Sequence, residues 1–312
     1  MLASLLASAP LVGCESTAPA ARADAVPESA DPSTIQLPTC GSDLSDAVGA
    51  LLEAAPSGHS SGYQVPSLAR EEAFEASVEA ALAGDGWEAS QSALLAGYEL
   101  CRTEDELRWT PDGPLEGSPL IALRPQGRAD WAFSVPHPVF ERGTAAQAID
   151  LYTATEARAL IIAGTHRCAN PGPAGCSGES DACGGPGQQH FESDMAHVVE
   201  GHFHRAHEAI AQMYPIVNFV NIHGMSFNGA SLSDGTLFDT TANSLLARFT
   251  DALAAELPGE EITSCNSYPG GDVRILRCGT QNTQGRFLNG VANACNMESS
   301  GATGRFVHLE QS

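Results

Sequence analysis

Apolar runs and helical stretches alternate through the second half of the chain, and this alternation constrains the fold more than any other feature. Buried strands are predicted at 131–135, 160–163, 216–222, 262, 273–278 and 306–309. Helices are predicted at 144–158, with Thr144 as the N-cap, and at 193–214 and 240–256. Strands that alternate with helices build a parallel sheet covered by helices. We therefore expect an α/β fold with a mixed, largely parallel sheet flanked by helices.

The first half of the chain predicts helices followed by short strands. Helical patterns cover 44–55 and 71–100, and the second pattern is expected to break at 84–86, where two glycines flank an aspartate. Short strands are predicted at 107–110 and 120–123, separated by a turn at 111–113. We expect these elements to belong to the same single domain, with bounds 39–312.

The N-terminal residues are typical of an export signal. Residues 1–12 are apolar except for two serines and the proline at position 10, and the segment Leu11-Val12-Gly13-Cys14 resembles a bacterial lipobox. We expect a lipoprotein-type signal at 1–14, with lipidation of Cys14 and anchoring in a bacterial cell envelope. Residues 15–38, rich in Ala, Pro, Ser and acidic residues, are predicted to form a flexible tether.

Composition excludes some partners and indicates the compartment. The formal net charge is −23, and all fifteen cationic residues are Arg, which argues against binding nucleic acid or an anionic membrane surface by charge. Membrane contact is therefore expected only through the lipid anchor. Eight cysteines follow Cys14, an even number that favours disulfides in an exported protein. They are Cys40, Cys101, Cys168, Cys176, Cys183, Cys265, Cys278 and Cys295, and none forms a C-x-x-C motif.

Five polar side chains follow the carboxyl ends of predicted strands. They are His137, Glu141, His166, Arg167 and His223. In open α/β sheets ligands bind at this edge, so residues that are distant in sequence meet there. Two imidazoles and one carboxylate form a suitable ligand set for catalytic Zn²⁺, with a fourth position left for water. We therefore predict a zinc site of His137, Glu141 and His223.

Hydrolysis at such a site also needs a base and a cation. In the last predicted strand, period-2 alternation places His308 and Glu310 on one face, and Glu310 is the candidate general base. Arg167 and Arg286 are the candidate cations, for an oxyanion or a substrate carboxylate. His166 either contacts substrate or forms a structural hydrogen bond within the cysteine-rich loop.

The predicted helix 193–214 offers a rival set of ligands. It carries Asp194, His197, His202, His204 and His207. Asp194, His197 and His204 have the spacing of one helix face, so a separate metal site is conceivable there. We favour a supporting role for Asp194 and His197, which would orient a metal ligand by hydrogen bonding. His202 is expected on a solvated face.

The motif order resembles that of the zinc carboxypeptidase superfamily. The segment PHPVFERGT, the later LIIAGTHR and the strand that ends in His223-Gly224 are similar to the poly-γ-glutamate hydrolase branch of that superfamily. The resemblance covers roughly residues 130–312. It implies a zinc carboxypeptidase-like (phosphorylase/hydrolase-like) fold, zinc bound by His137, Glu141 and His223, and Glu310 as the base. It also implies cleavage of an amide bond near a substrate carboxylate.

Two functions from different classes follow from these features. The first is an exported zinc-dependent hydrolase that acts on a peptide, a γ-glutamyl compound or polymer, or an N-acyl amino acid. The alternative is a lipid-anchored, non-enzymatic protein that binds metal or a small solute through the histidines of 193–214. A serine hydrolase has little support, because the sequence contains no G-x-S-x-G motif.

Overall fold

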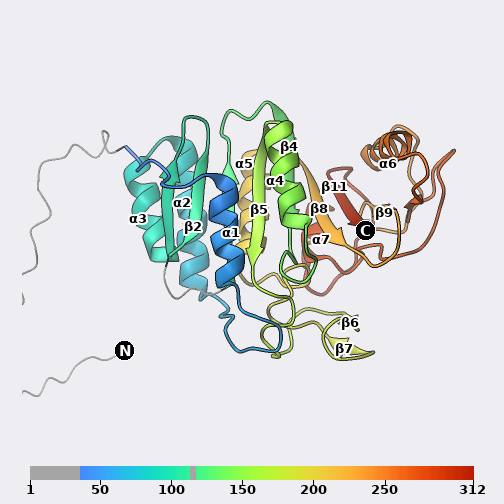
Figure 1. The fold of residues 1–312 in the computed structure, drawn as a ribbon, viewed down its shortest axis with the longest axis horizontal. Coiled ribbons are helices and arrows are strands. Elements are labelled where there is room, and N and C mark those ends of the chain that lie inside the picture. Colours follow the sequence, from blue (N-terminus) through green and yellow to red (C-terminus); the bar gives the residue numbers. More distant parts are fainter. Residues whose placement is uncertain (1–35, 113–116) are drawn as a thin grey trace, which may run out of the picture.

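The computed structural model describes residues 36–112 and 117–312. The predicted signal at 1–14 with Cys14, the tether as far as residue 35, and Gly113 of the predicted turn lie outside the described residues. A nine-stranded mixed sheet runs through the structure in the order β1-β2-β3-β5-β4-β8-β11-β9-β10 (Figure 1). Its central strands β5, β4, β8 and β11 are parallel neighbours, and the outer strands introduce antiparallel pairs.

The strands of this sheet are β1 (Tyr98–Arg102), β2 (Leu107–Pro111), β3 (Gly117–Leu123), β4 (Ala129–Val135), β5 (Ala157–Gly164), β8 (Asn218–Gly224), β9 (Ala230–Ser233), β10 (Ile262–Ser264) and β11 (Phe306–Gln311). A separate hairpin contains β6 (Glu179–Ser180) and β7 (Gln188–Gln189). The helices are α1 (Leu44–Ala54), α2 (Leu68–Ala83), α3 (Gly86–Ala96), α4 (Thr144–Ala154), α5 (His202–Met213), α6 (Leu245–Glu256) and α7 (Thr283–Leu288).

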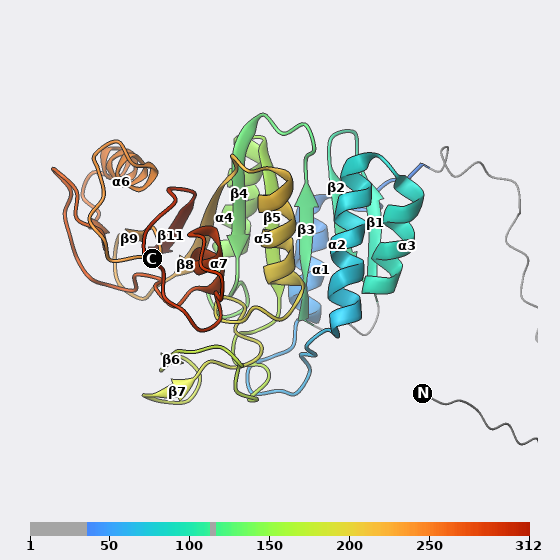
Figure 2. The ribbon, with the colours of Figure 1, turned by 180° about the vertical axis from the view of Figure 1, so that it is seen from behind.

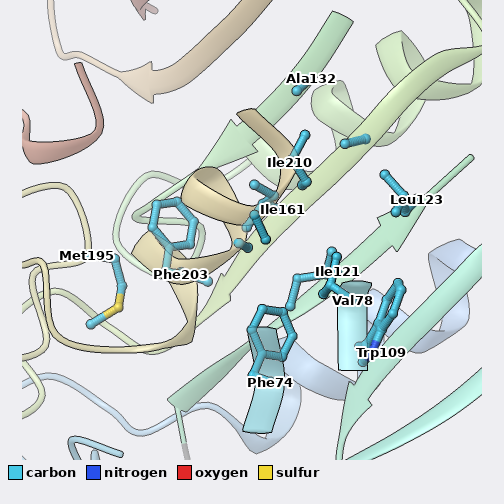
Figure 3. Close-up of a cluster of buried hydrophobic side chains, with 14 of the residues drawn as sticks. Phe74, Val78, Trp109, Ile121, Leu123, Ala132, Ile161, Met195, Phe203 and Ile210 are labelled. Carbon is cyan, nitrogen blue, oxygen red and sulfur yellow. The ribbon is translucent and has the colours of Figure 1, made fainter. Parts of the chain in front are cut away.

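Helices cover both faces of the sheet. Helices α1 and α4 lie on the face seen in Figure 1, and α2, α3 and α5 lie on the face seen in Figure 2. Each face has its own cluster of buried apolar side chains. Figure 3 shows part of the cluster beneath α2 and α5, where Phe74 and Phe203 approach Ile121 and Ile161 of the sheet. Burial of each such side chain contributes about 1.5–3 kcal/mol to folding.

The predicted α/β class is confirmed, and so is the break in the second helical segment. Helix α2 ends at Ala83 with Gly84, which has φ 83°, as its C-cap, and α3 begins at Gly86 after its N-cap Asp85, whose carboxylate accepts a hydrogen bond from the amide of Glu88. The prediction of helix up to Leu100 was wrong, because Gly97 ends α3 in the left-handed conformation and β1 follows.

Elements in the second half of the chain also differ from the prediction. Helix α4 ends at Ala154, and its N-cap is Gly143, because the hydroxyl of Thr144 donates to the carbonyl of Glu141 instead. Helix α6 starts at Leu245, capped by Ser244, which accepts a hydrogen bond from the amide of Ala247. Residues 273–278 form no strand and contribute only one isolated bridge.

The histidine-rich helix is shorter than predicted. Helix α5 begins at His202, and residues 193–201 form turns, so Asp194 and His197 do not lie on a helix. His202 is buried against the rings of Phe74 and Tyr98, which contradicts its predicted exposure. Burial lowers the pKa of His202 to about 4 and that of His207 to about 3. Both side chains are therefore neutral parts of the core at pH 7.

Four disulfides join the eight described cysteines, as the even count predicted. The pairs are Cys40–Cys101, Cys168–Cys183, Cys176–Cys295 and Cys265–Cys278. Such a set indicates folding in an oxidising environment. In the part of the chain that the structure describes, no helix combines the length and apolar character needed to span a bilayer.

Candidate metal centre

A cleft of about 530 Å³ lies where the central parallel strands end. Its walls come from the turn after β4, the ends of β8 and β11, the hairpin residues around β6, and the loop 277–281. The ionisable side chains that line it are His137, Arg167, Glu179, Asp181, His190, His197, His223, Arg277, His308 and Glu310. Most of the residues predicted for the site are therefore brought together in one place.

His137, Glu141 and His223 converge in this cleft. One helical turn joins the first two, because the amide of Glu141 donates to the carbonyl of His137 at 2.8 Å. The Glu141 carboxylate consequently faces both imidazoles, with Oε1 3.0 Å from His137 Nδ1 and Oε2 3.3 Å from His223 Nδ1. The amide of Gly224 donates to Oε2 at 3.0 Å and fixes the carboxylate further. All three side chains are buried.

The electrostatics of this group fit a cation. Burial opposes ionisation of Glu141, yet His137 and His223 hold the pKa of its carboxyl well below the usual range. Burial and Arg167 oppose the charged form of His137, but Glu141 and Asp194 outweigh them and raise its pKa. The same carboxylates that favour the charged imidazole would also favour a metal cation at this position.

Asp194 connects three side chains of the site by hydrogen bonds. Its Oδ1 lies 2.7 Å from His137 Nε2 and 2.8 Å from His197 Nδ1, and its Oδ2 accepts two hydrogen bonds from Arg167, at 2.7 and 3.2 Å. Burial opposes its charge, but Arg167, His197 and His137 keep the pKa of Asp194 well below its usual range. When His137 Nε2–H donates to Asp194, the opposite nitrogen, Nδ1, is the one available to a metal.

His197 meets Asp194 although the predicted helix is absent. The segment turns at this point, and the amide of His197 donates to the carbonyl of Asp194 at 2.8 Å. The His197 ring stacks on His190, with ring centroids 3.7 Å apart. Burial lowers the pKa of His197 to about 3. The hydrogen bonds that join His137, Asp194 and His197 are therefore positioned by a turn rather than by a helix face.

Glu310 lies beside His223 on the neighbouring strand. The parallel register of β11 and β8 pairs these two residues directly, and both are buried. The ring of His308 lies 4.5 Å from that of His223. Burial raises the pKa of Glu310. Three buried atoms here, His223 Nε2, His308 Nδ1 and Glu310 Oε2, lack a hydrogen-bond partner among the described residues.

Three overlapping groups in or next to the cleft have potential ligand atoms that all lie within 4.8 Å of one another, close enough to hold a metal ion. They are His137–Glu141–His223, His137–Asp194–His197 and His223–His308–Glu310. The Asp194 group suits an ion least, because the Arg167 guanidinium already occupies that carboxylate. In the first group a single carboxylate stands between two imidazoles, which is the set that the sequence predicted. The buried cluster can thus hold a metal ion.

Of the other predicted site residues, some line the cleft and some lie outside it. Arg167 lines the cleft, bonded to Asp194 and 3.5 Å from Glu141. His166 lies outside the cleft lining, where its Nδ1 accepts from the amide of Cys168, which favours the structural alternative. The assignment of Arg286 to substrate was wrong. Its guanidinium donates to the carbonyls of residues 280, 294 and 295 and is absent from the lining.

Among the cleft residues that were not predicted from the sequence are His190, Arg277 and Asp181. Each comes from an irregular segment, where no periodic pattern fixes the direction of a side chain. Their nearness in sequence to Cys183 and Cys278 was the one available signal, since disulfides hold these loops in place.

No family model matches the chain, and neither the curated proteins nor the solved structures contain a match to it.

Proposed function

We propose that this protein is a zinc-dependent hydrolase that cleaves an amide bond with water. The observation that carries the proposal is the convergence of His137, Glu141 and His223 beside the buried carboxylate of Glu310. Two imidazoles and a carboxylate are the donors that catalytic zinc takes, and such sites keep a position open. The cleft supplies that open side, because these residues line or adjoin a solvent-connected space.

The charge of the cluster supports a divalent ion. The buried carboxylates of Glu141 and Asp194 share one buried guanidinium, that of Arg167, and a third carboxylate, Glu310, is buried beside His223. With neutral imidazoles this leaves an excess of two negative charges, which is costly in a buried place unless it is compensated. A zinc ion would offset that charge, polarise the amide carbonyl and lower the pKa of water.

The chain's own residues would perform the remaining steps. Glu310 accepts a proton from the attacking water and passes it to the leaving amine, and its raised pKa suits a base that must also act as an acid. Arg167 supplies positive charge beside the developing oxyanion. Asp194 holds both His137 and Arg167 by hydrogen bonds and so keeps them in position.

The substrate class and setting rest on the sequence resemblance. The zinc carboxypeptidase-like fold, and kinship with the poly-γ-glutamate hydrolase branch, are supported by ligands at the ends of parallel central strands. Peptides, γ-glutamyl compounds and N-acyl amino acids are the proposed substrates. Four disulfides support export, and lipidation of Cys14 would hold the enzyme at the cell envelope.

The non-enzymatic alternative required metal or solute binding by the histidines of 193–214. His202, His204 and His207 are buried and join no possible metal-binding group among the described residues, and His197 joins one only together with His137 and Asp194. His207 Nδ1 hydrogen-bonds to the carbonyl of Phe203, and His202 packs between aromatic rings. These contacts favour the enzyme over that alternative.

Hydrolysis of a panel of γ-glutamyl and N-acyl amino-acid amides tests the proposal. We expect at least one compound to be cleaved, with activity lost in a chelator and restored by stoichiometric Zn²⁺. Restoration matters because it separates removal of the ion from unfolding, which circular dichroism would monitor in parallel. Activity that persists in the metal-free, folded protein would refute the proposed mechanism.

A further inference from the structure

Two arginines line the cleft, and their surroundings differ. Arg167 is nearly fully buried, and its guanidinium is bound to Asp194 and close to Glu141. Arg277 is exposed, and no carboxylate of the described residues lies within ion-pairing distance of it. Arg277 is therefore the cleft guanidinium that still has its donors available to an incoming anion.

The backbone around Arg277 is held on both sides. Arg277 has φ 51°, a left-handed conformation that is unusual for a residue with a side chain. The hydroxyl of Ser231 donates to the carbonyl of Leu276 at 2.8 Å, and that of Ser233 donates to the carbonyl of Cys278. Cys278 is also bonded to Cys265. Two buried serines of β9 and a disulfide thus impose a conformation that the residue would not adopt readily on its own.

The same loop brings Arg277 to the part of the cleft that His308 and Glu310 line. Gly279 lies so close to His308 that an added Cβ would stand 2.6 Å from the imidazole, so only glycine allows this approach. Arg277 and Glu310 both line this cleft. The exposed carboxylates of Glu179 and Asp181 line the cleft as well. They repel anions, so an anion that enters the cleft is attracted to the position of Arg277.

We propose that Arg277 binds a carboxylate of the substrate and thereby determines specificity for acidic substrates. The inference rests on the proposed hydrolase function and names the residue that recognises the acid. An exposed guanidinium pairs with a carboxylate through a fork of two hydrogen bonds. Arg167 is less suited to this role, because its Nε and Nη2 donate to Asp194 and its Nη1 lies 3.5 Å from Glu141.

Calorimetric binding of glutarate and butyrate tests this role. The two ligands share one carboxylate, so the difference between them reports the second carboxylate of glutarate alone. We expect the wild-type protein to bind glutarate about 10-fold or more tightly than butyrate, as one charge-assisted contact implies. Arg277→Gln should bind both ligands alike, and Arg277→Lys should keep part of the preference. Arg274→Gln is the matched control, because Arg274 lies in the same loop but pairs with Glu261.

The inference would be overturned if Arg277→Gln kept the wild-type preference for glutarate over butyrate. It would also be overturned if the wild-type protein bound neither ligand, or bound both equally. The titrations are run with and without Zn²⁺. A protein that takes up no zinc but loses the glutarate preference in Arg277→Gln would contradict the hydrolase and support the carboxylate site. A protein that binds zinc but shows no effect of Arg277→Gln would contradict only the carboxylate site.

Discussion

Replacement of Asp194 by asparagine is expected to lower the free energy of unfolding of the metal-free protein by about 3–5 kcal/mol. The amide would keep the shape of the side chain but lose the charge that compensates Arg167 and His137. A buried guanidinium left without its carboxylate keeps the cost of desolvation and loses the compensating attraction. Urea denaturation followed by circular dichroism measures the difference, with the slope of the transition compared to confirm that both proteins unfold similarly.

Asp130→Asn is the matched control for this prediction. Asp130 also pairs with an arginine, Arg158, at 3.0 Å, but its carboxylate is partly exposed. Loss of that pair should cost less than about 1 kcal/mol, because solvent screens it. Equal effects of the two replacements would show that Asp194 does not organise the site. Zinc affinity should fall in addition by about 10–100-fold in the Asp194 variant, as for other carboxylates that orient a metal-binding imidazole.

Glu310→Gln is expected to reduce hydrolysis by about 10²–10⁴-fold while zinc content stays unchanged. The amide keeps the size of the side chain but cannot accept a proton from water. The comparison uses the compound that the wild-type protein cleaves fastest, with kcat and zinc content measured on the same samples. Glu261→Gln serves as the control, because it alters an exposed carboxylate that does not line the cleft.

Two outcomes would contradict the role of Glu310. If Glu310→Gln retained the wild-type rate, another group would have to act as the base. If the variant lost its zinc, Glu310 would be a ligand, and the ion would lie in the group formed with His223 and His308. Zinc content and kcat measured on the same samples therefore distinguish a Glu310 that acts as the base from a Glu310 that is a metal ligand.

The metal group could be predicted from the sequence because it follows from strand direction. His137 and His223 stand at the carboxyl ends of parallel strands, and such ends share one edge of the sheet, so both side chains were expected at that edge. Glu141 follows His137 by four residues, and one helical turn returns it to the same side. Glu310 was predictable for a similar reason, because alternation in a buried strand fixes its face.

Residues outside regular elements could not be placed in this way. The segment 193–201 has a helical pattern, yet long-range contacts override it: Ser193 donates to the carbonyl of Arg167, and Asp194 binds His137. These contacts need the segment to turn, and Gly201, with φ 116°, separates it from α5. Arg277 depends on a left-handed backbone and on a disulfide whose partner the sequence does not specify.

Zinc content of the purified full chain tests whether His137 and His223 bind the metal. The measurement compares the wild-type protein with His137→Ala, His223→Ala and His204→Asn, each confirmed as folded by circular dichroism. We expect one zinc per chain in the wild type and in His204→Asn, and essentially none in the other two variants. Full zinc content in both His137→Ala and His223→Ala, or loss of zinc in His204→Asn alone, would contradict the assignment of the metal centre.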